Sequence, residues 1–200
     1  MADVTLPERA SVLIIGDFNV GKSTLIKYQR TKKFDDTIIP TMEIEPSIIS
    51  VPVNGKELNI TVKDSPGMKK DSMKFGRFVF PEFQKCAVIF FVYDKTYRPS
   101  FDLITDLKQN VDDLINRRME CFLVGNKCDQ TNEEDVTLKD GKDRCSELKM
   151  DLFIEISAKE GTNVEELFHK AALRLKDMEL HFGSTKELPK SEITPKNCRC

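Results

Sequence analysis

The length and the charge balance of the chain limit what it can be. Its 200 residues suit one domain with a single sizeable core, and 40% hydrophobic with 32% charged residues is an ordinary globular balance. The formal net charge of −2 gives no overall attraction to nucleic acid or to an anionic membrane. We therefore expect no nucleic-acid partner, and any membrane attachment would need a local device.

Targeting signals and cysteines indicate the compartment. The first residues lack the basic stretch and the apolar run of a signal peptide. No run approaches 18 apolar residues, so we expect no membrane span. Cys86 and Cys121 lie in apolar runs, which indicates buried, reduced thiols rather than a disulfide framework. These features predict a cytoplasmic protein.

Short apolar segments predict six strands. Residues 11–15 form an apolar run that is rich in β-branched side chains and closed by Gly16, which is typical of a buried strand. Residues 58–62 alternate between apolar and polar side chains, as a half-buried strand should. Before them, Asn54-Gly55 is a strong hairpin signal. The predicted strands are 11–15, 44–53, 58–62, 86–93, 121–124 and 152–156.

Segments with apolar residues at helical spacing predict helices at 22–32, 100–118 and 163–181. Strands that alternate with helices imply an α/β fold, in which a mostly parallel sheet has helices on both faces and the hairpin adds one antiparallel edge. We expect the folded domain to cover residues 1–182. Residues 183–200 contain few apolar residues, two prolines and mixed charge, which predicts a flexible tail.

A glycine-rich loop follows the first predicted strand. Residues 16–23 read G-D-F-N-V-G-K-S and match the phosphate-loop pattern G-x-x-x-x-G-K-[ST], between a strand and a helix. Backbone N–H groups would surround the phosphates, Lys22 would reach the β- and γ-phosphates, and the Ser23 hydroxyl would bind Mg²⁺. The alternative is an ordinary tight turn, and ATPases and kinases carry this loop too. The predicted phosphate-binding residues are Asn19, Val20, Gly21, Lys22, Ser23 and Thr24.

A second motif, N-K-C-D at residues 126–129, follows a predicted strand, where open parallel sheets bind ligands. The Asp129 carboxylate can accept two hydrogen bonds from guanine, whereas adenine would leave it unpaired. The S-A-K segment at residues 157–159 can close the pocket, with one backbone N–H facing the base carbonyl. Alone, N-K-x-D is also compatible with a solvated loop. The residues predicted to contact or enclose the base are Asn126, Lys127, Asp129, Ser157, Ala158 and Lys159.

With these motifs in this order, the sequence resembles the Ras superfamily of small GTPases from Ser11 to His181. The resemblance implies a P-loop NTPase fold with a six-stranded mixed sheet and five helices. It also implies GTP or GDP and Mg²⁺ as ligands, and effector, exchange-factor and escort proteins as partners. Phe34 matches the family's aromatic residue that packs on the guanine, with a core aromatic as the alternative.

Two further segments resemble the family's switches. Thr41, in the segment I-P-T-M-E, lies 18 residues after Ser23 and would bind Mg²⁺ and sense the γ-phosphate. Asp64 opens the segment D-S-P-G and would hold Mg²⁺ through water. The N–H of Gly67 would contact the γ-phosphate, whose loss would release both segments.

Two positions depart from the family pattern. A glutamine usually follows D-x-x-G and orients the attacking water, but Met68 stands there and cannot donate or accept usefully. The loop's third residue is usually small, but here Phe18 should crowd the space of that water and of an arginine finger. The other groups expected to act in hydrolysis, Lys22, Thr41 and Gly67, are retained. We therefore predict GTP binding with hydrolysis at least about tenfold slower than the intrinsic Ras rate of roughly 3–5 × 10⁻⁴ s⁻¹.

Several features resemble the Rab branch of this superfamily. They are Y-D-K-T at residues 93–96 with the following S-F, the G-D opening of the phosphate loop, and the ending C-R-C. Cys198 and Cys200 would then carry two prenyl groups that hold the protein peripherally on the cytosolic face of a membrane. Free thiols or adventitious metal ligands are the alternatives. Two features do not match the Rab pattern: the segment 42–46, and Lys63, which stands where Rab proteins usually have a tryptophan.

Taken together, the residues predict a Rab-like, Mg²⁺-dependent GTP/GDP switch that acts on membranes, in vesicle trafficking, as a slow GTPase. The alternative is a nearly hydrolysis-dead scaffold that stays loaded with GTP and recruits effectors. A third class, an ATP-dependent small-molecule kinase, is disfavoured by Asp129 and by the lack of an evident acceptor site.

Overall fold

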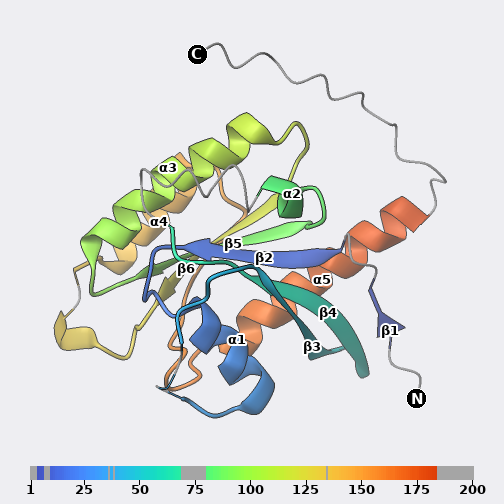
Figure 1. Ribbon diagram of the computed structural model, residues 1–200, viewed down its shortest axis with the longest axis horizontal. Coiled ribbons are helices and arrows are strands. Elements are labelled where there is room, and N and C mark those ends of the chain that lie inside the picture. The colour runs from blue at the N-terminus through green and yellow to red at the C-terminus, as the bar shows by residue number, and fades with distance from the viewer. Residues whose placement is uncertain are drawn as a thin grey trace.

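A computed structural model describes residues 4–6, 10–35, 37, 39–68, 80–133 and 135–183. These residues form three layers, with a twisted sheet between two groups of helices (Figure 1). Within the described ranges the strands are β1 Val4–Thr5, β2 Ser11–Gly16, β3 Glu45–Val53, β4 Lys56–Asp64, β5 Val88–Asp94, β6 Glu120–Asn126 and β7 Leu152–Glu155.

The sheet is parallel except at one edge. β4 pairs with β2 and with β1 in parallel, β2 continues to β5, β6 and β7 in parallel, and only β3 pairs antiparallel, with β4. The six predicted strands and the mixed sheet are therefore confirmed. The two-residue β1 is a seventh strand that the sequence pattern did not predict, because so short a segment carries no periodicity.

The hairpin at the antiparallel edge forms as predicted. Asn54 and Gly55 both have positive φ angles, of 51° and 74°, and Val53 lies opposite Lys56 in the register. Two consecutive positive φ angles are the signature of a type I′ turn, whose twist matches that of the flanking strands. The turn fixes which face of β3 and β4 meets the core.

Five α-helices lie within the described residues, as the resemblance implied: α1 Lys22–Thr31, α2 Phe80–Phe83, α3 Arg98–Leu114, α4 Leu138–Glu147 and α5 Val164–Gly183. The prediction of a helix over 100–118 was wrong at its end. Ile115 is extended (φ −115°, ψ 120°), so α3 ends at Leu114. The sequence pattern did not predict α4, because this segment is largely polar. Thr137 and Asp140 form a capping box at its start.

Alternate side chains of the central strands pack into two separate hydrophobic cores, one on each face of the sheet. Val12 and Ile14 of β2 point to the face covered by α1 and α5, and Leu13 and Ile15 point to the face covered by α2, α3 and α4 (Figure 1). Every residue of β2 and β5 is buried, as in a sheet covered on both sides. The carboxyl ends of these strands form the edge where the candidate site lies.

Two predictions concern parts of the chain beyond this description. The predicted tail covers residues 183–200, of which only Gly183, the last residue of α5, is described. Cys198 and Cys200 therefore lie outside the described residues.

Among the helices that the structure describes, none combines the length and the apolar character that a membrane crossing requires.

Candidate nucleotide-binding site

A cavity of about 440 Å³ opens at the carboxyl ends of the central strands. Its walls come from the loop after β2 with the start of α1, the segment before β3, and the loops after β4, β6 and β7. The structure thus brings together segments that are far apart in the sequence. The predicted site residues that line the cavity are Asn19, Gly21, Lys22, Ser23, Thr24, Phe34, Thr41, Gly67, Asn126, Lys127, Asp129, Ala158 and Lys159.

The phosphate loop leads directly into the N-terminus of α1. Gly21, just before this helix, has a φ of 92°, and a Cβ atom there would lie 2.3 Å from Nδ2 of Asn126. Both the backbone angle and the space therefore require glycine. Among the residues that the structure describes, no side chain caps α1, and no acidic residue occupies its first turn. The free N–H groups and the positive end of the helix face the cavity, an arrangement that binds anions.

Lys22 brings a buried positive charge to this loop. Its Nζ donates hydrogen bonds to the carbonyl oxygens of Gly16 (3.2 Å) and Asp17 (2.7 Å). Burial lowers the pKa of Lys22 to about 8, while the carboxylates of Asp64 and Asp17 act in the opposite direction. An anion in the cavity would stabilise the charged ammonium that burial disfavours.

Three oxygen-bearing side chains converge beside Lys22. The Ser23 hydroxyl lies 2.9 Å from the Thr41 hydroxyl, and these two oxygens lie 2.5 Å and 3.1 Å from Oδ2 of Asp64. The other oxygen of Asp64, Oδ1, is buried and has no hydrogen-bond partner within the described part of the chain. Burial, as the largest effect, raises the pKa of Asp64. Two hydroxyls and a carboxylate with an unsatisfied oxygen suit a hard cation such as Mg²⁺, so the donor set fits the predicted metal.

The base side of the cavity is held by hydrogen bonds between its loops. Asn126 donates from Nδ2 to the carbonyl oxygen of Val20 (2.7 Å) and accepts at Oδ1 from the N–H of Ala158 (3.0 Å). The Ser157 hydroxyl donates to Oδ1 of Asp129 at 2.6 Å. Val20 and Ser157 thus stand behind the lining and orient residues within it. Asn126, at the end of β6, thereby joins the phosphate loop to the loop after β7.

Phe34 and Lys127 form the outer part of the base side. Phe34 is 45% exposed and lines the cavity, which excludes the alternative of a core aromatic. Lys127 lines the same cavity, and its Nζ pairs with Oδ2 of Asp94 at 2.5 Å. Sequence reasoning missed Asp94. The available signal was its position as a carboxylate at the end of a buried strand, next to the strand that ends in N-K-x-D.

The two departures from the family pattern lie where the phosphate loop meets the segment after β4. A Cβ atom at Gly67 would lie 2.5 Å from the ring carbons of Phe18, so this ring rests directly on Gly67 at the cavity wall. Met68 is only 2% exposed and belongs to the core on the α3 face, with Leu13 and Phe83. Its N–H donates to the carbonyl oxygen of Gly16 at 3.1 Å. The side chain at the usual glutamine position therefore lies in the core.

The fold and this site define a P-loop nucleotide-binding protein. The sequence profile of the Ras family matches residues 11–177. The chain is 32% identical to the Ras-related protein RABC1 of Arabidopsis thaliana over 166 residues, 82% of this chain and 76% of that protein. It is 31% identical to human Ras-related protein Rab-8B over 164 residues, 80% and 75% of the two chains. The Ras-related protein SEC4 of Candida albicans is 30% identical over 161 residues, 80% and 74%.

The chain therefore belongs to the Ras family, and its similarities place it near the Rab proteins.

Proposed function

We propose that this protein is a GTP- and GDP-binding switch that requires Mg²⁺ and hydrolyses GTP weakly. The observation that carries the proposal is the shared cavity. On one side Ser23 and Thr41 line the cavity, with Asp64 behind them in contact with both hydroxyls, and on the other Ser157 orients the Asp129 carboxylate. A metal-bound phosphate and a guanine base fit this pair of features, as they do in Ras-family proteins.

Each group has a role in this proposal. The N–H groups of the phosphate loop and Lys22 hold the phosphates, and Asp129 selects guanine. Ser23, Thr41 and, through water, Asp64 would hold Mg²⁺, which would supply positive charge to offset that of the phosphates. The N–H of Gly67 contacts the γ-phosphate, so that GTP and GDP hold the switch segments differently.

Weak hydrolysis follows from two side chains. Met68 lies in the core and offers no polar group to an attacking water. Phe18 occupies the wall beside Gly67, where an arginine from another protein would have to enter. If Met68 and Phe18 together abolish hydrolysis, the protein is a scaffold that stays loaded with GTP.

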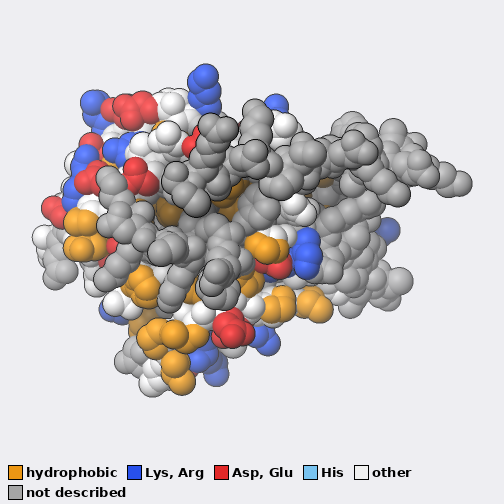
Figure 2. Space-filling view, turned by 45° about the horizontal axis from the view of Figure 1, so that its top comes forward, with side chains coloured by type: hydrophobic (Ala, Val, Ile, Leu, Met, Phe, Trp, Pro, Cys, Tyr) orange, Lys and Arg blue, Asp and Glu red, His pale blue; other side chains and the backbone are white. Residues whose placement is uncertain are grey.

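The exposed apolar side chains of Ile39, Met42 and Ile48 are compatible with both a slow GTPase and a scaffold, since effectors need an accessible apolar surface. Figure 2 shows hydrophobic side chains exposed among charges of both signs on one face of the molecule.

Nucleotide choice tests the proposal. We expect excess GTP or GDP, but not ATP, to displace bound GDP from purified protein, and EDTA to speed GDP release. Displacement by ATP at equal concentration would contradict the guanine assignment and revive the kinase alternative. Asp129→Asn preserves the shape of the side chain but removes its charge and replaces one of its two acceptor oxygens with an NH2 donor that faces the guanine donors, so it should weaken GDP binding by about 100-fold or more.

Membrane attachment through Cys198 and Cys200 is a separate part of the proposal. Two prenyl chains would anchor the protein on the cytosolic face of a membrane, with a role in vesicle trafficking and with escort, exchange-factor and effector proteins as partners. The double change of both cysteines to serine should move the protein from the membrane to the soluble fraction of cells. Unchanged membrane association would contradict the anchor.

A further inference from the structure

We propose that Asp94 is a positioning residue for nucleotide retention, because it holds Lys127 in place at the base pocket. Oδ2 of Asp94 lies 2.5 Å from Nζ of Lys127, and the two side chains are 9% and 32% exposed. Asp94 does not line the cavity, so it acts through Lys127 and not by touching the base. This inference rests on the proposed guanine-nucleotide site.

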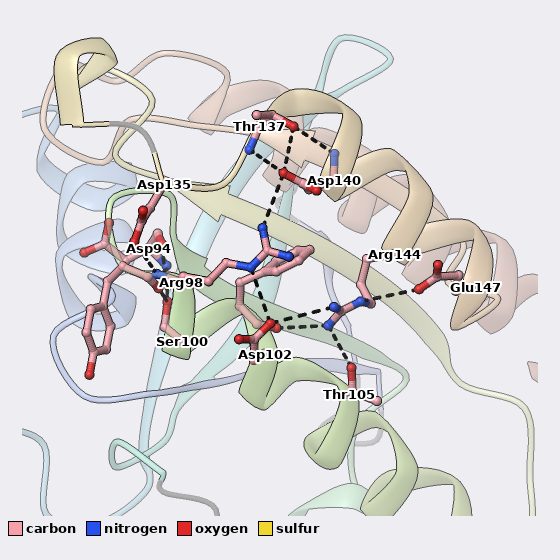
Figure 3. A network of polar contacts seen from close by, with 12 residues as sticks. Asp94, Arg98, Ser100, Asp102, Thr105, Asp135, Thr137, Asp140, Arg144 and Glu147 are labelled. Atoms are coloured by element: carbon pink, nitrogen blue, oxygen red, sulfur yellow. Dashed lines mark hydrogen bonds and ion pairs between the residues drawn. The ribbon is translucent and has the colours of Figure 1, made fainter.

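The Asp94 carboxylate is itself fixed from its other side. Its Oδ1 accepts hydrogen bonds from the N–H (2.8 Å) and the hydroxyl (2.7 Å) of Thr96. The backbone N–H of Asp94 donates to the hydroxyl of Ser100 in α3 at 3.0 Å, and Figure 3 shows Asp94 beside Ser100. Oδ1 of Asp94 is thus held by Thr96, in the turn that follows β5, and Oδ2 pairs with the ammonium of Lys127.

The turn that carries Asp94 is anchored to its surroundings. The N–H of Lys95 donates to the carbonyl oxygen of Asn126 (3.1 Å), and the Lys95 ammonium pairs with Glu155 (2.8 Å) where both side chains are largely buried. Arg98, at the start of α3, pairs with Asp140 of α4 (3.4 Å), within the network drawn in Figure 3. Asp94 therefore presents its charge from a rigid support rather than from a mobile loop.

Lys127 is a side chain that needs such support. Its backbone has a φ of 67°, in the left-handed region that a lysine seldom adopts, and its stem has four rotatable bonds. Ordering a long lysine only when the nucleotide binds would cost side-chain entropy. A fixed carboxylate orders the lysine beforehand, so its stem can lie over the base at a smaller entropic cost. The expected consequence is slower release of the nucleotide.

Release of N-methylanthraniloyl-GDP from the full chain, in the presence of Mg²⁺, tests this role. We expect Asp94→Asn to accelerate release by about tenfold, since it removes one charge-assisted contact. In a Lys127→Met background, which itself releases faster, Asp94→Asn should add less than about twofold. This non-additivity separates positioning through Lys127 from a general loosening of the fold.

Two further variants sharpen the experiment. Asp112→Asn removes a carboxylate that holds the buried Lys108 at 2.6 Å, away from the cavity, and should leave the release rate unchanged. Thr96→Val keeps the Asp94 charge but removes one hydrogen bond to it, and should accelerate release by about twofold to threefold. This milder variant gives the answer if Asp94→Asn does not fold.

The outcomes separate the two proposals. If the wild type binds the labelled GDP and neither Asp94→Asn nor Thr96→Val alters release, the positioning role is overturned and the proposed function stands. Equal acceleration by Asp94→Asn with and without Lys127 would also overturn it, in favour of a purely structural role. Failure of the wild type to bind guanine nucleotide would overturn the proposed function, and this inference with it.

Discussion

Restoring the family's usual glutamine should fail to restore hydrolysis in this protein. The Met68 side chain is 2% exposed and packs in the core, so Met68→Gln would place a carboxamide among apolar neighbours. Burying an amide without a partner costs about 1–3 kcal/mol, and the lost burial of apolar atoms adds about 1 kcal/mol. We expect a loss of about 3 kcal/mol in the free energy of unfolding.

Thermal unfolding by circular dichroism, with excess GDP and Mg²⁺ held constant, measures this loss. For a chain of this size, 3 kcal/mol corresponds to a fall in Tm of about 6–12 °C. The matched control is Met68→Leu, a volume-conserving change that should cost less than about 1.5 kcal/mol. Single-turnover hydrolysis of GTP by Met68→Gln should stay within about threefold of the wild type.

A stable Met68→Gln variant that hydrolyses GTP at least about tenfold faster than the wild type would contradict this prediction. It would mean that the residue faces the phosphates and that the core position of Met68 does not limit the chemistry.

Three other predictions follow from particular contacts. Lys63 is 3% exposed and pairs with Glu82 at 2.7 Å, so Glu82→Gln should leave a buried charge without this partner and lower the free energy of unfolding in urea by about 2 kcal/mol. The same pair predicts a pH dependence: burial alone would raise the pKa of Glu82, but the hydrogen bond and the charge of Lys63 leave it lowered. The pair's contribution to the free energy of unfolding is therefore fully present above the unfolded pKa of about 4.3 and is lost as the pH falls through the folded pKa of Glu82. The difference in free energy of unfolding between the wild type and Glu82→Gln should therefore shrink between pH 7 and pH 3. A difference that stays constant over this range would contradict the role assigned to the pair. Gly21→Ala should weaken GDP binding by at least about tenfold, measured by calorimetry, because its Cβ would strike Asn126, whereas Gly55→Ala, also at positive φ but with open space around it, should leave binding intact.

Much of the fold could be predicted from the sequence because its signals are local. The buried run of β2, the alternation of β4 and the Asn54-Gly55 turn each specify their own structure, and all three formed as expected. The end of α3 and the whole of α4 were missed for a physical reason. Ile115 turns away from helical geometry although its apolar side chain continues the pattern, and the start of α4 depends on a cap rather than on an apolar face.

The site could be predicted only as far as its motifs reach. The sequence identified most of the residues that meet at the cavity, because the phosphate loop, Gly67, the N-K-C-D motif and the S-A-K segment lie at the carboxyl ends of strands. Phe34 and Thr41 lie between α1 and β3 and could be predicted only from the resemblance to the family. It could not place Met68, since the same methionine could face the phosphates or the core, and only the packing of Leu13 and Phe83 around it decides between them. Asp94 was missed because its role depends on a contact between the end of β5 and the loop after β6, which no motif records.

The most direct test of the central claim is single-turnover hydrolysis of GTP by the purified protein with Mg²⁺, following bound GTP and GDP over hours. We expect GTP to bind and then to persist, with a hydrolysis rate at least about tenfold below the intrinsic Ras rate of roughly 3–5 × 10⁻⁴ s⁻¹. Appearance of GDP at that ordinary rate would contradict it, and would show that another group positions the attacking water in spite of Phe18 and Met68.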